Sequence, residues 1–144
     1  MKIRILAIGK VKERFTQEWI NEFLKRMNKY CKLEIIELKE NNKKKEAEEL
    51  IKKIRDDEFV IALERVGQQI NSEDFSELIK KKIQEKDICF IIGGPDGLDA
   101  EVLQKTKLHL SISNMTFTHQ IARLLLIEQI YRAFTIIKGE KYHK

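Results

Sequence analysis

The sequence predicts an α/β protein with a mostly parallel sheet flanked by helices. Segments of strand character alternate along the chain with amphipathic helical segments, which is typical of parallel crossover connections. The run Ile88–Ile92 is continuously apolar, as expected for a strand that is buried on both faces. No linker, repeat or low-complexity tract interrupts the 144 residues, so we expect one domain over residues 1–144.

Four strands and three helices are expected in the first two thirds of the chain. The strands are Lys2–Ile8, the segment with Leu33, Ile35 and Leu38, then Phe59–Leu63 and Ile88–Ile92. The helices are Glu13–Asn28, Lys43–Asp56 and a segment through Ile83 that Asn71 caps. Lysine runs such as Lys80–Lys82 fit the solvated faces of these helices, and phosphate contact is the alternative interpretation.

The C-terminal third departs from this alternation. A short helix is expected near Asp99–Lys105, an alternating segment at Leu108–Ser113 and a polar loop at Ser113–Thr118. The following helix, Ile121–Ile137, is apolar over more than one stripe of its surface. Such a helix needs more cover than its own sheet supplies, and a second subunit is one source of that cover.

Composition narrows the class of partner. The chain carries 28 Lys and Arg residues against 23 Asp and Glu, a net charge of +5, which favours an anionic partner such as RNA. Many basic proteins bind no nucleic acid, so charge alone does not decide. The two cysteines, Cys31 and Cys89, lie in apolar stretches and indicate reduced thiols, with no zinc pattern. Met1–Ile8 resembles a strand more than a signal peptide, so we expect a cytoplasmic protein without a membrane span.

The segment Gly93–Gly97, of sequence GGPDG, is the first candidate site. It holds three of the six glycines and the only proline, and it follows the buried strand at the edge where open α/β sheets bind ligands. A plain tight turn explains Pro-Asp-Gly equally well. The segment does not match the G-x-G-x-x-G fingerprint, and the chain has no P-loop motif, so an ordinary dinucleotide or P-loop site is excluded.

Two further segments carry candidate chemistry. Ser113–Arg123 places small polar residues before the long helix, where free backbone N–H groups could bind a ligand or Thr118 could simply cap the helix. His119 within it could equally be a partly buried, satisfied side chain. The tail Gly139–Lys144 would usually be frayed, although Tyr142 and His143 offer a stacking ring and a group that titrates near neutral pH.

These segments together resemble the ribosomal RNA large subunit methyltransferase H family of the SPOUT superfamily. The resemblance covers the whole chain, and its specificity comes from the combination and order of the motifs. The matching stretches are Met1–Ile3, Ala7–Lys10, Ile92–Leu98, Leu110–Phe117, His119–Gln120 with Arg123, Ile127–Phe134 and Tyr142–Lys144. Two features depart from the family pattern: Thr118 stands where proline is common, and the stretch between Leu38 and Ile54 looks short.

The resemblance implies a fold and an activity. The fold is a SPOUT α/β sheet with a C-terminal deep trefoil knot that holds the cofactor, in a homodimer. Knots are rare, so general rules of chain topology do not predict one. The activity is S-adenosylmethionine-dependent methylation of N3 of a pseudouridine in 23S ribosomal RNA, within assembled ribosomes.

The resemblance also assigns residues to roles. Arg123 and His119 are implied to contact RNA. Three residues are implied to be catalytic, namely Arg132, Tyr142 and His143, with Arg132 as a candidate for phosphate or base contact. His143 is the expected aid to proton loss from N3, with Tyr142 orienting the ring. The residues implied to bind S-adenosylmethionine are Leu63, Gly93, Ile112, Ser113, Asn114, Met115, Thr116 and Phe117.

Two other functions are open on charge and pattern alone. One is a non-catalytic RNA- or ribosome-binding α/β module, which would bind RNA without the cofactor. The other is a flavodoxin-like binder of phosphate or nucleotide, suggested only by the alternation of strands and helices.

Overall fold

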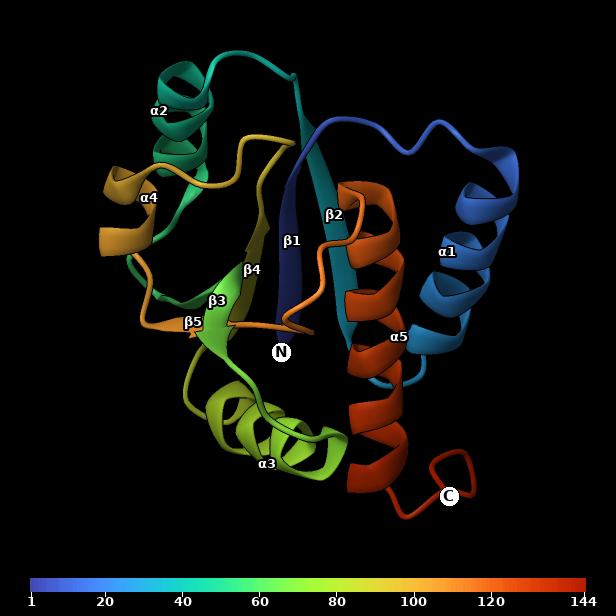
Figure 1. Ribbon diagram of the computed structural model, residues 1–144. Helices are drawn as coiled ribbons and strands as arrows, with labels where there is room; N and C mark the ends of the chain where they lie inside the picture. Colours follow the sequence, from blue (N-terminus) through green and yellow to red (C-terminus); the bar gives the residue numbers. More distant parts are fainter.

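Figure 1 shows a computed structural model that describes all residues from 1 to 144. Five strands pair in parallel in the order β2-β1-β4-β3-β5, which confirms the mostly parallel α/β sheet. The deep trefoil knot stays a prediction. In chain order the elements are β1 (Lys2–Ile8), α1 (Arg14–Met27), β2 (Lys32–Leu38), α2 (Lys43–Lys53), β3 (Glu58–Gln68), α3 (Ser72–Ile83), β4 (Asp87–Ile92), α4 (Ala100–Gln104), β5 (Leu108–Leu110) and α5 (His119–Ile137).

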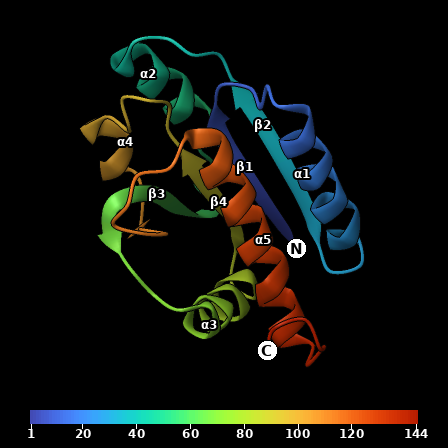
Figure 2. The same ribbon diagram turned by 45° about the vertical axis from the view of Figure 1, so that its right-hand side comes forward.

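Helices cover both faces of the sheet (Figures 1 and 2). The larger core joins one face to α1, α3 and α5, and the smaller core joins the other face to α2 and α4. Successive strand residues point to opposite faces, so Ile5 of β1 enters the larger core and Leu6 the smaller one. The central strand β4 does the same, which explains its continuous apolar run.

The long helix α5 packs along the larger core, with contacts to both α1 and α3 (Figure 2). Tyr131 and Phe134 of α5 meet the rings of Phe23 and Tyr30 at centroid distances of 5.5–6.0 Å. The protomer therefore covers much of the apolar surface that the sequence suggested for a second subunit. Neither α5, with 19 residues, nor any other helix is long and apolar enough to cross a membrane.

Three element boundaries differ from the sequence prediction by three residues or more. Helix α2 ends at Lys53 instead of residue 56, because Ile54 is extended (φ −67°, ψ 136°) and the next turn leads into a buried ion pair between Arg4 and Glu58. Strand β3 continues to Gln68, since Gln68 pairs with Leu110 of β5 after a register shift that follows Leu63. Strand β5 stops at Leu110 because the chain then bends into the loop before α5.

Candidate active site

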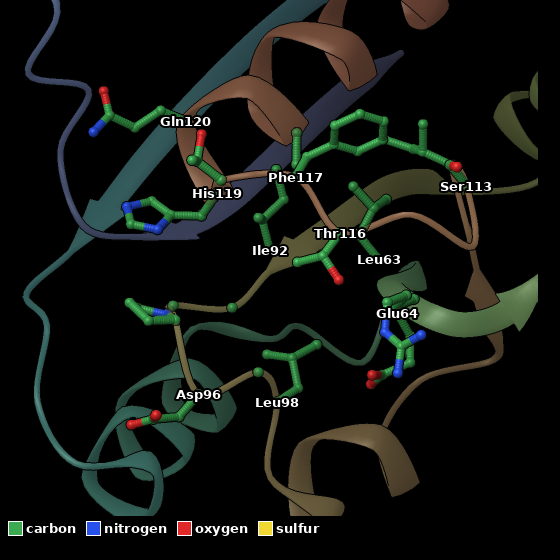
Figure 3. Close-up of a pocket in the computed structure, with 18 of the residues that line it drawn as sticks. Leu63, Glu64, Ile92, Asp96, Leu98, Ser113, Thr116, Phe117, His119 and Gln120 are labelled. Atoms are coloured by element: carbon green, nitrogen blue, oxygen red, sulfur yellow. The ribbon is translucent and has the colours of Figure 1, made fainter.

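A cavity of about 810 Å³ lies at the carboxyl ends of β3, β4 and β5. Its walls come from the end of β3, the turn after β4 and the loop before α5. Figure 3 shows Leu63, Leu98 and Thr116, one from each wall, facing the shared space. Ligands of open parallel sheets bind at this edge, so the cavity is the leading candidate site.

The glycine-rich turn after β4 forms one wall and is tightly built. The N–H of Gly97 donates to the carbonyl of Gly94 over 3.0 Å, with Pro95 in the second turn position. Gly97 has φ +77°, a conformation that L side chains rarely adopt. A Cβ on Gly93 would lie 3.0 Å from the carbonyl carbon and oxygen of Gly97. The two interpretations of this segment are thus compatible: it is a tight turn, and its backbone lines the cavity.

The loop before α5 is fastened to β3 through Ser111. The N–H of Ser111 donates to the carbonyl of Gln68 over 2.9 Å. Its hydroxyl lies 2.8 Å from the carbonyl oxygen of Arg65 and 3.0 Å from that of Ser113. Ser111 is only 4% exposed, so its polar groups are used inside the fold. The loop is thereby held over the cavity.

The structure brings together most of the residues that the resemblance assigned to the cofactor. Asn114 is the one that does not line the cavity; its carbonyl oxygen lies 3.5 Å from an Arg65 guanidinium nitrogen. The assigned residues that do line it are Leu63, Gly93, Ile112, Ser113, Met115, Thr116 and Phe117.

Sequence reasoning missed several lining residues. Glu64 and Arg65 lie within β3, directly after Leu63, and line the cavity, although the predicted strand ended at Leu63 and only Leu63 was singled out there. Their position at the carboxyl end of a parallel strand was the available signal. Ser111 was missed because its role is to hold the loop, and a lone serine carries no sequence signal for that.

The two residues assigned to RNA contact lie in different surroundings. His119 lines the cavity, with Nε2 3.8 Å from a carboxylate oxygen of Glu40. Arg123 is 2% exposed; it donates to the carbonyl of Gly9 over 2.9 Å and forms an ion pair with Glu37. Its guanidinium therefore ties α5 to the ends of β1 and β2, and its burial argues against the RNA contact expected from the sequence.

The C-terminal tail is docked on its own protomer. Tyr142 packs edge-on against Tyr131 with centroids 4.8 Å apart, and the Arg132 guanidinium lies 4.8 Å from the Tyr142 ring centroid. Two nitrogens of Arg132 donate to one carboxylate oxygen of Glu128, over 2.6 and 2.9 Å. Burial, followed by the nearby Glu128 charge, raises the pKa of Tyr142. His143, Tyr142 and Arg132, the three residues assigned to catalysis, thus form one cluster.

The cavity and the catalytic cluster lie at opposite ends of α5. His119 begins this helix beside the cavity, whereas Arg132 lies near its other end and the tail follows (Figure 1). A helix of 19 residues spans about 28 Å at 1.5 Å per residue. One protomer therefore does not bring its own tail to its own cavity.

Comparison with known proteins identifies the family. A family model described as "Predicted SPOUT methyltransferase" matches residues 1–143. The chain belongs to the SPOUT methyltransferase family. Ribosomal RNA large subunit methyltransferase H of Clostridium botulinum (strain Kyoto / Type A2) is 46% identical over the full length of both chains. The protein of the same name from Carboxydothermus hydrogenoformans is 44% identical, also over both full lengths.

The fold agrees with this assignment. A probable methylase family protein from Haemophilus influenzae Rd KW20 superposes with a TM-score of 0.61 at 19% identity, over 97% of this chain and 67% of that chain. As a SPOUT methyltransferase the chain needs a methyl donor, and the cavity suits one of nucleoside size. A Cβ on Gly93 would crowd the carbonyl group of Gly97. The lining of the cavity includes apolar side chains such as Leu63 and Leu98, and two acidic residues, Glu64 and Asp96.

Proposed function

We propose that this chain transfers a methyl group from S-adenosylmethionine to N3 of a pseudouridine in 23S ribosomal RNA, within assembled ribosomes in the cytoplasm. The observation that carries the proposal is the single cavity formed jointly by Gly93–Gly97 and Ile112–Phe117. The name of the full-length relatives supports ribosomal RNA of the large subunit as the substrate class. The resemblance described above supplies the pseudouridine and the N3 position.

The cavity would hold S-adenosylmethionine by shape and by backbone groups. Leu63 and Leu98 offer apolar contacts for the adenosine, and the Ile112–Phe117 loop offers backbone N–H and C=O groups for its polar edges. Glu64 and Asp96 line the cavity and carry negative charge, which suits a positively charged sulfonium. When bound, the donor supplies a methyl carbon that is already activated for displacement. The protein's part is alignment, which can lower a barrier by roughly 7–11 kcal/mol.

The tail cluster would handle the proton on N3. His143 takes that proton as the methyl group is transferred, and Tyr142 provides a ring against which a base can stack. Arg132 offers donors to a phosphate or carbonyl oxygen. These assignments rest on the family resemblance and on the clustering of the three side chains.

A homodimer would complete the site, because the tail of one protomer lies too far from its own cavity. Residual apolar surface supports this: Phe15 and Trp19 on α1 and Ile121 on α5 are 70%, 58% and 45% exposed. Exposed aromatic side chains of this kind are typical of protein interfaces. We infer that two copies associate through α1 and α5, placing the tail of each at the cavity of the other. The deep trefoil knot is likewise proposed from the family assignment.

Two measurements test the proposal. Calorimetric titration with S-adenosylmethionine should give micromolar binding at the cavity. A methylation assay should show transfer to intact ribosomes, and comparison with free large subunits and naked RNA defines the substrate. Affinity for RNA without affinity for the donor would favour the non-catalytic RNA-binding module. Binding of phosphate or nucleotides without methylation would favour the flavodoxin-like binder.

A further inference from the structure

The tail of the chain is fixed by a residue that the proposed mechanism does not yet use. Glu73, in the first turn of α3, places a carboxylate oxygen 2.8 Å from Nε2 of His143. The other ring nitrogen of His143, Nδ1, lies 3.1 Å from a guanidinium nitrogen of Arg132. The imidazole is therefore bracketed by an acceptor on one side and a donor on the other.

This bracket selects one tautomer of the imidazole. An arginine guanidinium has N–H donors and no acceptor, so Nδ1 must accept through its lone pair. The carboxylate of Glu73 has acceptors only, so Nε2 must carry the proton and donate it. In its neutral form, His143 therefore carries its proton on Nε2 and its basic lone pair on Nδ1.

Glu73 is itself well placed to stay ionised. The hydrogen bond from His143, followed by one to its own backbone, holds the pKa of Glu73 below its ordinary value. The N-terminal end of α3 also favours a negative charge. A second contact fixes α3 against α5: the hydroxyl of Ser72 donates to the side-chain oxygen of Gln129 over 2.7 Å.

We propose that Glu73 is a positioning residue for methyl transfer, which anchors the tail and holds His143 with a lone pair on Nδ1 to take the N3 proton. This inference rests on the proposed function. The Arg132 N–H that now faces Nδ1 stands where the N3–H of the target base would donate. Glu73 then stabilises the imidazolium that forms, as a carboxylate does for a base histidine in a hydrolase triad.

The step balances in atoms and electrons. The N3–H bond breaks and its proton goes to Nδ1 of His143. The electron pair left on N3 forms the bond to the methyl carbon, and the carbon–sulfur electron pair stays on the sulfur of the donor. The ring ends with protons on both nitrogens, and the Glu73 carboxylate faces the one on Nε2.

The charged and titratable groups around the His143 ring come from three helices and the tail. They are Glu73 from α3, Arg132 and Glu128 from α5, Arg26 from α1 beside the Tyr131 and Tyr142 rings, and Tyr142 and Lys144 of the tail itself. Only Glu73 supplies a negative charge in direct contact with the ring. Replacing Glu73 with an uncharged residue of the same shape therefore isolates the contribution of its charge to the methyl-transfer rate.

The test uses Glu73→Gln and Glu73→Ala in the full-length protein, with Glu77→Gln as the matched control. Glu77 is exposed one turn further along α3 and makes no side-chain hydrogen bond or ion pair. Single-turnover methylation of ribosomes is measured across pH, and S-adenosylmethionine affinity is measured separately. Glu73→Ala should slow transfer about 10- to 100-fold, part of the roughly 10²–10⁴-fold that a positioned base contributes. Donor affinity should not change.

The glutamine variant separates positioning from tail anchoring. Its amide oxygen still accepts from Nε2–H, so the tail stays docked and part of the rate returns. Its missing charge should move the acid limb of the pH–rate profile to lower pH, because the protonated ring loses its carboxylate partner. A Glu73→Gln profile identical to wild type would reduce Glu73 to an anchor and overturn the proposal.

A readout without RNA separates this inference from the proposed function. Nitrogen NMR of the protein, with His143 assigned among the three histidines by a His143→Asn variant, reports the tautomer directly. We expect an unprotonated Nδ1 in the wild type and a mixed population in Glu73→Ala. A protonated Nδ1 in the neutral wild-type ring overturns the inference even if methylation is normal. Absence of methylation by the wild type, with the expected tautomer present, rejects the proposed function alone.

Discussion

The two ends of α5 differ in how they are built. At its start, a glycine turn and a serine-fastened loop form a cavity mainly from backbone and apolar side chains. At its end, Arg132, Glu128, Tyr142, His143 and Glu73 form a charged cluster with direct side-chain hydrogen bonds. The first end suits the binding of a bulky nucleoside, and the second suits the movement of a proton.

This difference teaches that binding and proton chemistry are separable in the protomer. Tight backbone geometry fixes the shape of the cavity, so crowding should disturb donor affinity without touching the tail. Ionised side chains fix the tail, so loss of one should disturb the rate without touching the cavity. The helix between them spans about 28 Å, and the proposed homodimer would join the two.

The largest difference between the effect on methyl-transfer rate and the effect on donor affinity is expected from His143→Ala. Removal of the imidazole should slow methyl transfer roughly 10²–10⁴-fold, because the N3 proton loses its acceptor. The donor affinity should stay within error of wild type, since His143 acts on the target base and does not line the donor cavity. Single-turnover assays on ribosomes and calorimetry together check both parts. Full turnover by this variant would remove His143 from the mechanism.

The opposite result, a loss of donor affinity with an intact tail, is expected from Gly93→Val. A side chain here meets the carbonyl group of Gly97 at 3.0 Å, and overpacking of this kind costs about 1–3 kcal/mol. Because the displaced turn is a wall of the cavity, donor affinity should fall at least about 10-fold, equivalent to roughly 1.4 kcal/mol of binding free energy. Glu48→Val is the control, because Glu48 is exposed on α2 and does not line the cavity. Equal loss of donor affinity in both variants would contradict the assignment of the cavity.

A smaller effect is expected at the proposed interface. Replacing the half-exposed Trp19 with Ser should weaken dimerisation about 30-fold, the loss of about 2 kcal/mol that marks an interface hot spot. Sedimentation across a concentration series measures it. Glu48→Ser, an exposed position of α2 on the other face of the sheet, should leave the association unchanged. A wild-type protein that sediments as a monomer at all concentrations would contradict the homodimer.

The smallest effect is expected from an alkylating reagent, which should not react with the two thiols of the folded protein. Burial raises the pKa of Cys31 to about 11 and that of Cys89 to about 12. At neutral pH both groups stay protonated, and the thiolate is the reactive form. An alkylating reagent at pH 7.5 should modify neither until the protein is unfolded, as mass spectrometry would show. Rapid labelling of either thiol in the folded protein would contradict their burial.

The sequence predicted the scaffold better than the details of the site. Hydrophobic periodicity and Gly93–Gly97 were sufficient for the parallel sheet and for the position of the cavity. Periodicity missed the end of α2 because a buried pair, Arg4 with Glu58, sets that turn across distant elements. The same long-range pairing explains Arg123: a charged residue looks exposed in the sequence, yet Glu37 and Gly9 hold it inside.

The tail is another segment whose structure depends on long-range contacts that the local sequence does not reveal. Composition predicts a frayed end after Gly139, whereas contacts with α3 and α5 hold His143 in place. Those contacts join residues far apart in the chain, so local pattern alone could not predict them. Glu73 in particular looks like an ordinary acidic residue of a helix start.

The central claim is that the cavity of one subunit works with the tail of the other, and mixed dimers test it most directly. Gly93→Val subunits keep an intact tail, and His143→Ala subunits keep an intact cavity. The two variants are mixed at a donor concentration too low to occupy the Gly93→Val cavity. After subunit exchange, half of the dimers are mixed and each has one complete site. The account predicts recovery of about a quarter of wild-type methylation. No recovery, in mixtures shown to have exchanged subunits, would contradict it.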